Sequence, residues 1–496
     1  MGLIRPPVRR IRVGRLIAAA AVVLLAAGAV LYAVPHLRCG NIWADIRALG
    51  DGGECVGTTD GSHVFDPDFT DIQAQIAEEN ARVAEQVDGG AEAARIALLT
   101  QLTPTGESPM SPDQVLRSLE GAHVAQVRAN HSRGIGDPAP LIQLVLANEG
   151  SRQEHWEPVV DRLVEMSAEP VPLLAVIGMG VGIQATSDAA ERLSANDVAM
   201  VAAVVAADEL NDATHPGLLR VGPSSTDYAT ALRGYVEAHD RLRTGMLVYD
   251  ENAPDLFVTS LASAYSAEMS AYTEGIPPQP FSGTALDDEP SPTLFASASQ
   301  NICDAEVDMV FYAGRGVDLR GLVDSLHSRS CARDPLTVFF ASTGLALRGD
   351  DDALDLLEEG NLTVVQAAAS DPDWINGARG APEGFAAFVE AYDDNIGDPR
   401  AGLANGYAIA HHDAMMVAVQ ALRLRDRDGG GLAESLEGMR RALFRLNSAN
   451  VVRAAGGTLA FSTTRDGDPG NKPVPVVEFP RSPEAPSHDL YTTPEE

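Results

Sequence analysis

The sequence predicts an α/β protein in which helices cover both faces of parallel β-sheets, preceded by an N-terminal transmembrane helix. Three observations support this prediction. From about residue 93, short apolar runs alternate with amphipathic stretches, the order expected for parallel strands connected by helices. A second, similar series begins near residue 246, so the globular part divides into two α/β halves. Residues 16–34 form an uninterrupted apolar run.

The apolar run at residues 16–34, LIAAAAVVLLAAGAVLYAV, predicts a membrane anchor. Nineteen helical residues at about 1.5 Å each span the ~30 Å hydrocarbon core of a bilayer. Five arginines and no acid precede the run, which keeps residues 1–15 on the cytoplasmic side as a short stub. We therefore expect a single-pass protein of the cell membrane whose bulk is extracellular. The alternative is a cleaved signal peptide, whose apolar region is only about 7–15 residues long.

Length and charge exclude some classes of function. A chain of 496 residues exceeds what one hydrophobic core supports, so two or three domains are expected. The net charge of −34 repels nucleic acid and anionic lipid surfaces. We therefore expect no nucleic-acid partner.

Four cysteines fit an oxidising compartment. Three pairings are possible, and the local pairing of Cys39 with Cys55 and of Cys303 with Cys331 is the simplest. A zinc site is the competing interpretation, but the sequence has no CxxC motif and no nearby histidine pair to support it. We expect two structural disulfides.

Apolar periodicity places the elements of the first half after a juxtamembrane segment, residues 35–92, which contains a helical pattern at 71–87. The predicted strands are 96–99, 141–146, 173–177 and 200–205, and the predicted helices are 112–129, 157–166 and 184–193. Pro112 follows Ser111, the usual combination of N-cap and first-turn residues.

The second half repeats this alternation. Its predicted strands are 246–248, 309–312, 337–340 and 362–367, and its helices are 256–269, 319–326, 384–392, 406–424 and 432–447. Residues 276–300 are rich in proline, serine and acids and predict an irregular excursion. A strand, a turn and a final strand close the domain, and the tail at 481–496 is predicted to be disordered.

Five local features resemble one known family. They are RIALLTQLTPTG at the first strand, the loop GMGVGIQATSD, MVAAVVAADEL with the following LLRVGPSSTDYATAL, the strand end Phe311-Tyr312-Ala313-Gly314, and the closing GTLAF with Gly467-Asp468. In order and spacing they are similar to the type I periplasmic solute-binding proteins, especially the branched-chain amino-acid-binding class. The resemblance covers about residues 93–480.

The resemblance implies two doubly wound parallel-sheet lobes, joined by three crossovers, that close over a small ligand. The first lobe would comprise residues 93–238 and 362–450, and the second would comprise 239–361 and 451–480. In the family such a protein captures a solute for an ABC permease. The alternative is a sensory or scaffold ectodomain that kept this fold without a transport role.

Ligands of open α/β sheets bind beyond the carboxyl ends of the strands, which selects the loops of the candidate site. The predicted ligand-binding residues are Gly182, Ile183, Gln184, Val205, Ala206, Arg315, Ser342 and Thr343.

The candidate loops depart from those of the amino-acid-binding relatives. Those relatives use serine and threonine on the first lobe to hold a carboxylate, whereas the loops here are Val181-Gly182-Ile183 and Val204-Val205-Ala206. They also use an acid on the second lobe for the amino group, where this chain has Thr343. A free amino acid is therefore not expected. Arg315 favours an anionic or carboxylate-bearing ligand, and the alternative is a solvated loop arginine.

Other motifs give no catalytic, cofactor or metal site. Gly178-x-Gly180-x-Gly182 lacks the GxGxxG spacing of a dinucleotide fingerprint. His411 and His412 are neighbours in a helical stretch and point in different directions, and the run Asp350–Asp352 lacks the DxDxDG order of a calcium loop. Since no GxSxG elbow is present either, we expect no enzyme activity.

Overall fold

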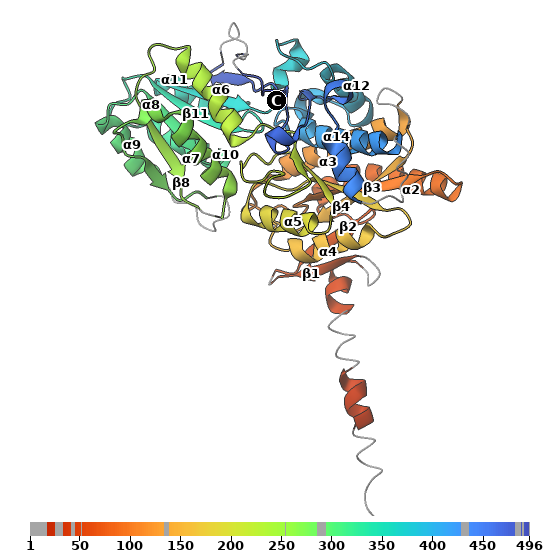
Figure 1. The fold of residues 1–496 in the computed structure, drawn as a ribbon. Helices are drawn as coiled ribbons and strands as arrows, with labels where there is room; N and C mark the ends of the chain where they lie inside the picture. Colours follow the sequence, from red (N-terminus) through yellow and green to blue (C-terminus); the bar gives the residue numbers. More distant parts are fainter. Residues whose placement is uncertain are drawn as a thin grey trace, which may run out of the picture.

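The computed structural model describes residues 17–24, 33–40, 45–50, 52–132, 138–252, 254–284, 294–427, 436–481, 488 and 491–495. Its globular part has two α/β lobes side by side, each with a mainly parallel sheet between layers of helices (Figure 1). The prediction of an α/β fold with two parallel-sheet lobes is confirmed.

The predicted membrane anchor falls largely on residues that the structure does not describe. Residues 17–24 are helical, whereas residue 16 and residues 25–32 lie outside the described residues. Residues 33–38 form another short helix. Among the described residues, no helix combines the length and the apolar character needed to cross a membrane.

The first lobe is built on a seven-stranded sheet of order β1-β2-β4-β3-β5-β6-β7. Its strands are β1 (Ile46–Leu49), β2 (Glu54–Thr59), β3 (Ala93–Thr100), β4 (Leu141–Asn148), β5 (Leu173–Gly178), β6 (Ala199–Ala202) and β7 (Leu218–Arg220). The strands from β4 to β7 are parallel, and their apolar residues are buried because helices cover both faces. The antiparallel pair β1–β2 extends the edge at β4.

Helices of the first lobe come from two separate stretches of the chain. They are α2 (Thr70–Asp88), α3 (Pro112–His131), α4 (Trp156–Met166), α5 (Gln184–Ser194), α12 (Phe385–Asn395), α13 (Pro399–Gly402), α14 (Tyr407–Arg427) and α15 (Leu436–Leu443). Ser111 and Gln114 form a capping box at the start of α3, as the Ser-Pro signal predicts. Helices α3 and α14 cross so closely that a Cβ at Gly121 would lie 2.1 Å from the carbonyl oxygen of Ala408.

The second lobe has a six-stranded sheet of order β15-β12-β11-β10-β8-β9, in which only β15 is antiparallel to its neighbour. Its strands are β8 (Gly245–Asp250), β9 (Gln279–Phe281), β10 (Met309–Ala313), β11 (Leu336–Ser342), β12 (Leu362–Ala368) and β15 (Val476–Phe479). Its helices are α6 (Ser225–Glu237), α7 (Leu256–Glu268), α8 (Ser270–Thr273), α9 (Ala296–Asp304), α10 (Gly316–His327) and α11 (Asp351–Glu359).

Four segments lie in a different part of the fold from the predicted one. The predicted juxtamembrane segment contributes β1, β2 and α2 to the first lobe. Strand β12 pairs with β11 over its whole length and so belongs to the second lobe. Helix α6 packs with the second sheet through the core around Leu232. The hairpin β13–β14 (Val452–Arg453 and Thr458–Leu459) packs on the first lobe, whose core includes Val452 and Leu459.

With these corrections, the chain passes between the lobes three times. The passages lie between β7 and α6, after β12, and between β14 and β15. The boundaries expected near residues 238 and 362 were wrong because apolar periodicity does not say which sheet a segment joins.

Both predicted disulfides are confirmed. Cys39 is bonded to Cys55 and Cys303 to Cys331, and there is no free cysteine. The segment predicted as an irregular excursion contains β9 and α9, while residues 285–293 lie outside the described residues.

Part of the predicted disordered tail is ordered. His488 and Thr492 form bridges to Val476 and Pro473, and Thr493 accepts a hydrogen bond from the backbone N–H of Lys472 at 2.9 Å. The prediction of disorder is wrong for these residues, because they pair with β15 and with the residues that precede it.

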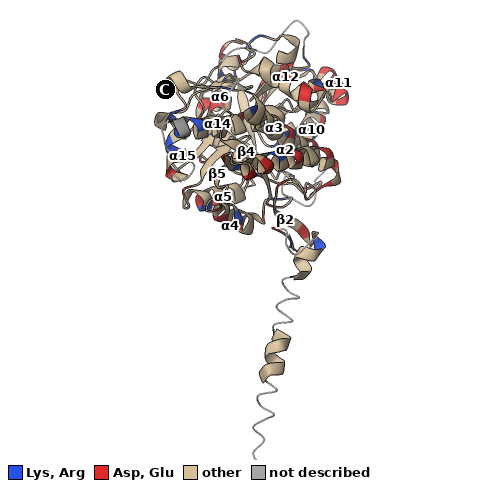
Figure 2. Ribbon diagram, turned by 90° about the vertical axis from the view of Figure 1, so that its right-hand side faces the viewer, with Lys and Arg blue, Asp and Glu red and all other residues tan. Residues whose placement is uncertain are grey.

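Acidic side chains are spread over many helices, and α11 carries a visible concentration of them (Figure 2). The run Asp350–Asp352, which was considered as a calcium site, lies at the start of α11. Asp350 caps α11 by accepting a hydrogen bond from the backbone N–H of Ala353 at 2.9 Å, and it pairs with Arg320 at 2.9 Å. The acidic run therefore stabilises the start of a helix.

Candidate ligand-binding cleft

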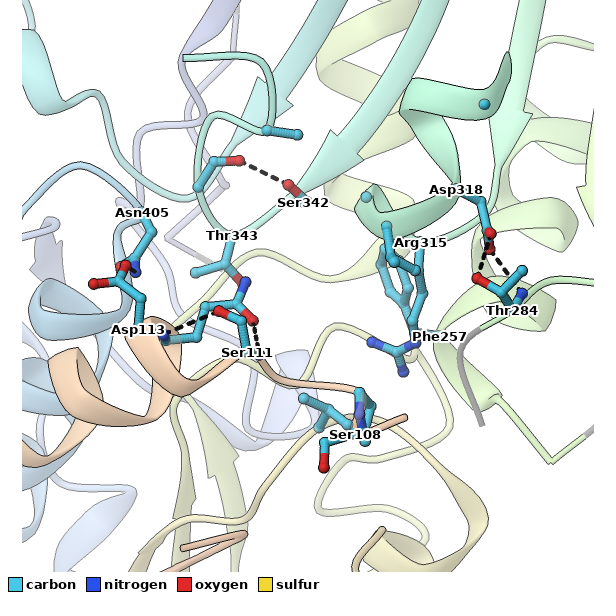
Figure 3. A pocket seen from close by; sticks show the side chains of 18 of the residues that line it. Ser108, Ser111, Asp113, Phe257, Thr284, Arg315, Asp318, Ser342, Thr343 and Asn405 are labelled. Carbon is cyan, nitrogen blue, oxygen red and sulfur yellow. Dashed lines mark hydrogen bonds between the residues drawn. The ribbon is translucent and has the colours of Figure 1, made fainter. Parts of the chain in front are cut away.

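A cleft of about 1400 Å³ lies between the two lobes. The first lobe contributes a loop at residues 105–114, parts of the loops after β5 and β6, and the residues that open α14. The second lobe contributes the first turns of α6 and α7, residues along α10 as far as Ser328, residues 294–296 and the loop after β11. Figure 3 shows side chains from both lobes turned toward this space. The cleft thus lies where strand ends meet helix N-termini.

Five of the eight predicted site residues line the cleft: Gly182, Ala206, Arg315, Ser342 and Thr343. The other three lie elsewhere. Ile183 and Val205 are buried in the core of the first lobe. Gln184 is exposed at the start of α5, where its side-chain amide donates a hydrogen bond to Asp188 at 2.8 Å.

The glycine-rich loop after β5 is shaped around a glutamine side chain. A Cβ on Gly180 would lie 2.2 Å from Nε2 of Gln153, and Oε1 of Gln153 accepts a hydrogen bond from the backbone N–H of Val181 at 3.1 Å. Gly180 has φ +57°, a conformation that favours glycine. Gly180 therefore makes room for a protein side chain and not for a dinucleotide phosphate.

Arg315 forms an ion pair with Asp255 inside the second lobe. Nη2 donates to Oδ1 of Asp255 at 2.9 Å, and Nε donates to Oδ2, so the contact is bidentate. Asp255 is fully buried and also caps α7, while the Arg315 side chain is 12% exposed and its guanidinium lies 5.5 Å from the ring centre of Phe257 (Figure 3).

The ion pair changes the interpretation of Arg315. Burial on its own would lower the pKa of Arg315, but the charge and hydrogen bonds of Asp255 raise it above the ordinary value. The side chain is not a solvated loop arginine. The expectation of an anionic ligand rested on a free positive charge at Arg315, and Asp255 neutralises that charge. Local sequence patterns do not reveal the pair, because its members are 60 residues apart.

Two tyrosines that sequence reasoning missed also line the cleft. Tyr228 lies in the first turn of α6 and Tyr407 opens α14; their exposed fractions are 2% and 8%. Neither hydroxyl forms a hydrogen bond with the residues that the structure describes. Burial raises the pKa of Tyr407 to about 12, although the positive charge of Arg315 opposes the shift. The signal that could have found them is their place in the first turn of helices that enter the cleft.

Several polar side chains that line the cleft are hydrogen-bonded within the protein. The backbone N–H and the hydroxyl of Thr284 donate to Asp318 at 3.0 and 2.6 Å, and Asn405 donates to Asp113 at 2.8 Å (Figure 3). The hydroxyl of Ser342 donates to the carbonyl of Gly344 at 2.7 Å.

The histidine pair considered as a metal site has structural partners. His411 is buried and hydrogen-bonded to the carbonyl of Tyr407 at 2.9 Å, and His412 lies between Asp413 and Arg128. Among the described residues, the group with metal-ligand geometry is Glu54, Glu154 and His155, outside the cleft lining. Glu54 there already accepts hydrogen bonds from Thr103 and Ser151.

Comparison with solved structures identifies the fold. A substrate-binding protein of an ABC transporter from Desulfitobacterium hafniense, in complex with Leu, superposes with a TM-score of 0.57 at 16% identity, covering 80% of this chain and 99% of that chain. The chain has the type I periplasmic binding protein fold. No protein-family model and no curated protein matches it.

Two further proteins with this type I fold differ in the ligand named for them. The branched-chain amino acid binding protein from Streptococcus pneumoniae, in complex with isoleucine, has a TM-score of 0.56, 15% identity, and covers 78% of this chain and 96% of its own. A solute-binding protein from R. palustris, in complex with 4-hydroxybenzoate, superposes with a TM-score of 0.57 at 14% identity. The match covers 82% of this chain and 98% of that chain. At these identities the likeness shows the type I fold alone.

Proposed function

We propose that this protein is an extracellular, membrane-tethered solute-binding protein that captures a small ligand between its lobes for an ABC importer. The observation that carries the proposal is the interlobe cleft, which is lined by both lobes and contains two tyrosine hydroxyls without partners among the described residues. A ligand that contacts both lobes is held better when they close, so binding and closure are coupled.

Tethering to the membrane is the second part of the proposal. The apolar run at residues 16–34 follows an arginine-rich stub, and the side chains of Ile17, Val22, Val23 and Leu24 are between 65% and 73% exposed. A bilayer would cover these side chains. Two disulfides fit an extracellular location. A tether raises the effective concentration of the receptor near its permease without any further contact.

Transport is supported by the names of the structural neighbours, which are substrate-binding proteins of ABC transporters. Genes for a permease and an ATPase beside the gene of this chain would add support. A sensor kinase gene in that place would favour the sensory alternative.

The direct test is a thermal-shift screen of the full chain in detergent against amino acids, aromatic acids, amides and sugars. A ligand at one hundred times its dissociation constant stabilises the folded state by about 2.7 kcal/mol, so the unfolding midpoint should rise clearly. Thr343→Trp, which fills the cleft, should abolish the shift, and Thr463→Trp on the exposed surface should preserve it. An unchanged midpoint with every compound would contradict the proposal.

A further inference from the structure

The charged side chains that line the cleft already have partners within the protein. The two arginines form ion pairs, Arg315 with Asp255 and Arg348 with Asp373 at 3.1 Å. Three acids also form ion pairs: Asp113 with Arg117 at 3.2 Å, Asp324 with Arg320 at 3.3 Å and Glu107 with Arg152 at 4.0 Å. Asp318 accepts two hydrogen bonds from Thr284. Each of these residues except Asp318 faces an opposite charge, and Asp318 is buried with its carboxylate held by Thr284. None of them therefore offers an exposed charge that lacks a counter-charge.

The innermost pair, Arg315 with Asp255, has the greatest effect on the ligand. The Asp255 side chain has no exposed surface and both of its oxygens are engaged by Arg315, so a ligand ammonium group cannot reach this carboxylate. The same contact neutralises the positive charge of Arg315, so this charge is not available to bind a carboxylate group of a ligand. A charged ligand group would be taken out of water without a counter-charge, which is strongly unfavourable.

Hydrogen-bond donors nevertheless remain beside this pair. Nη1 of Arg315 makes no hydrogen bond to the described part of the chain, and an arginine nitrogen can only donate. The hydroxyls of Tyr228 and Tyr407 likewise make no hydrogen bond to the described part of the chain, and both residues are more than nine-tenths buried. These three groups come from both lobes and line the same cleft, so a ligand that accepts from them would engage the two lobes together.

Apolar side chains form part of the wall of the cleft. Phe257 lies under the Arg315 guanidinium, and Val181 and Val204 line the first-lobe side, where a carboxylate-binding site would need hydroxyl groups. The lining therefore suits an apolar body.

We propose that the cleft selects an uncharged small molecule with an apolar body and a carbonyl or amide oxygen as acceptor, and that the Arg315–Asp255 pair excludes free carboxylates and free ammonium groups. This inference rests on the proposed solute-binding function and names the chemical class of its ligand. The amide oxygen accepts from Nη1 of Arg315 and from the tyrosine hydroxyls, and no net charge is buried.

The first test uses compounds of one skeleton that differ in charge. Benzamide, benzoate and benzylamine are compared by calorimetry and thermal shift on the full chain at pH 7, together with N-acetyl-leucinamide and leucine. We expect the amides to bind at least tenfold more tightly than their charged counterparts. If a charged compound binds best, this inference is overturned while solute binding stands. If neither these compounds nor the wider screen gives binding, the proposed function fails and this inference fails with it.

The second test removes the charge of Asp255 without removing its cap. Asparagine is as good an N-cap residue as aspartate, so Asp255→Asn should leave α7 capped while the charge of Arg315 becomes available. We expect affinity for benzoate relative to benzamide to rise at least tenfold. Asp350→Asn is the matched control, because Asp350 also caps a helix and pairs with an arginine, but outside the cleft. That variant should keep the wild-type preference.

Arg315→Gln tests the role of the Arg315–Asp255 pair independently, in case the Asp255→Asn variant does not fold. It exposes the carboxylate of Asp255, so affinity for benzylamine relative to benzamide should rise at least tenfold. Folded variants whose preference between charged and neutral compounds equals that of the wild type would overturn the inference.

Discussion

Phe257 and Gly182 meet at the seam between the lobes: the backbone N–H of Phe257 donates to the carbonyl oxygen of Gly182 at 2.9 Å. Gly182 follows β5 of the first lobe, and Phe257 lies in the first turn of α7 of the second. Both residues line the cleft. The floor of the cleft is thus formed by main-chain contact between the lobes.

The approach of the lobes on the other side of the cleft depends on Gly344. A Cβ there would lie 1.9 Å from the carbonyl oxygen of Asn405, which belongs to the first lobe. Gly344→Ala should therefore force the lobes apart at this point and weaken ligand binding at least tenfold. Spin labels at Glu107 and Asp324, on opposite walls of the cleft, should move further apart in this variant. Gly52→Ala is the control, since open space surrounds that position, and an unchanged label distance in Gly344→Ala would contradict the prediction.

The hydroxyls of Tyr228 and Tyr407 should contribute to binding. Tyr228→Phe and Tyr407→Phe each remove one hydrogen bond to the ligand, which corresponds to about 1 kcal/mol, or about fivefold in the dissociation constant. Calorimetry with the best ligand from the screen measures the change. Tyr265→Phe is the matched control, because the Tyr265 hydroxyl is also buried without a partner in the described part of the chain but lies in the core of the second lobe. Equal effects of all three variants would remove the two tyrosines from the site.

The free energy of unfolding should decrease as the pH rises from about 5 to about 8, because of Glu149. Burial raises the pKa of Glu149 from 4.5 to about 8, so in this window the folded state retains a proton that the unfolded chain releases. Glu149→Gln keeps the neutral shape, so this variant should be the more stable one at pH 8. The slope of its unfolding free energy should be smaller by up to about 1.4 kcal/mol per pH unit. Denaturant unfolding at several pH values measures the slope. A curve parallel to the wild type would contradict the prediction.

Lys472 offers a probe of the third passage between the lobes. It is the single lysine of the chain, is 3% exposed, and donates a hydrogen bond to the carbonyl of Gly456 at 2.7 Å. An amine-reactive reagent should therefore modify it about tenfold or more slowly in the folded protein than in denaturant. Mass spectrometry of the peptide that contains Lys472 measures the rate. Equal rates in both states would show that this passage is open in the folded protein.

Local periodicity sufficed to predict most strands and helices. The strand predicted at 96–99 lies within β3, and the helix predicted at 406–424 matches α14, because the alternation of apolar residues depends only on neighbouring positions. The sheet that each strand joins depends on distant pairing. For this reason β12 was assigned to the wrong lobe, although its bounds were predicted well.

The candidate site was predictable at the level of loops but not of charge. The rule that ligands bind beyond strand ends led to Gly182, Arg315 and Thr343, which do line the cleft. The role of Asp255 was not predicted, because nothing near it in the sequence marks it as the partner of an arginine 60 residues away. The sequence could therefore predict a cationic group in the cleft, but not that the protein neutralises it.

The most direct test of the two-lobed capture mechanism is the distance between spin labels at Glu107→Cys and Asp324→Cys in the full chain. The four native cysteines are in disulfides, so the two introduced thiols are the ones that react. Pulsed dipolar spectroscopy should show a shorter and narrower distance distribution when the best ligand from the thermal-shift screen is added. A distribution that stays the same at saturating ligand would contradict closure of the lobes over a solute.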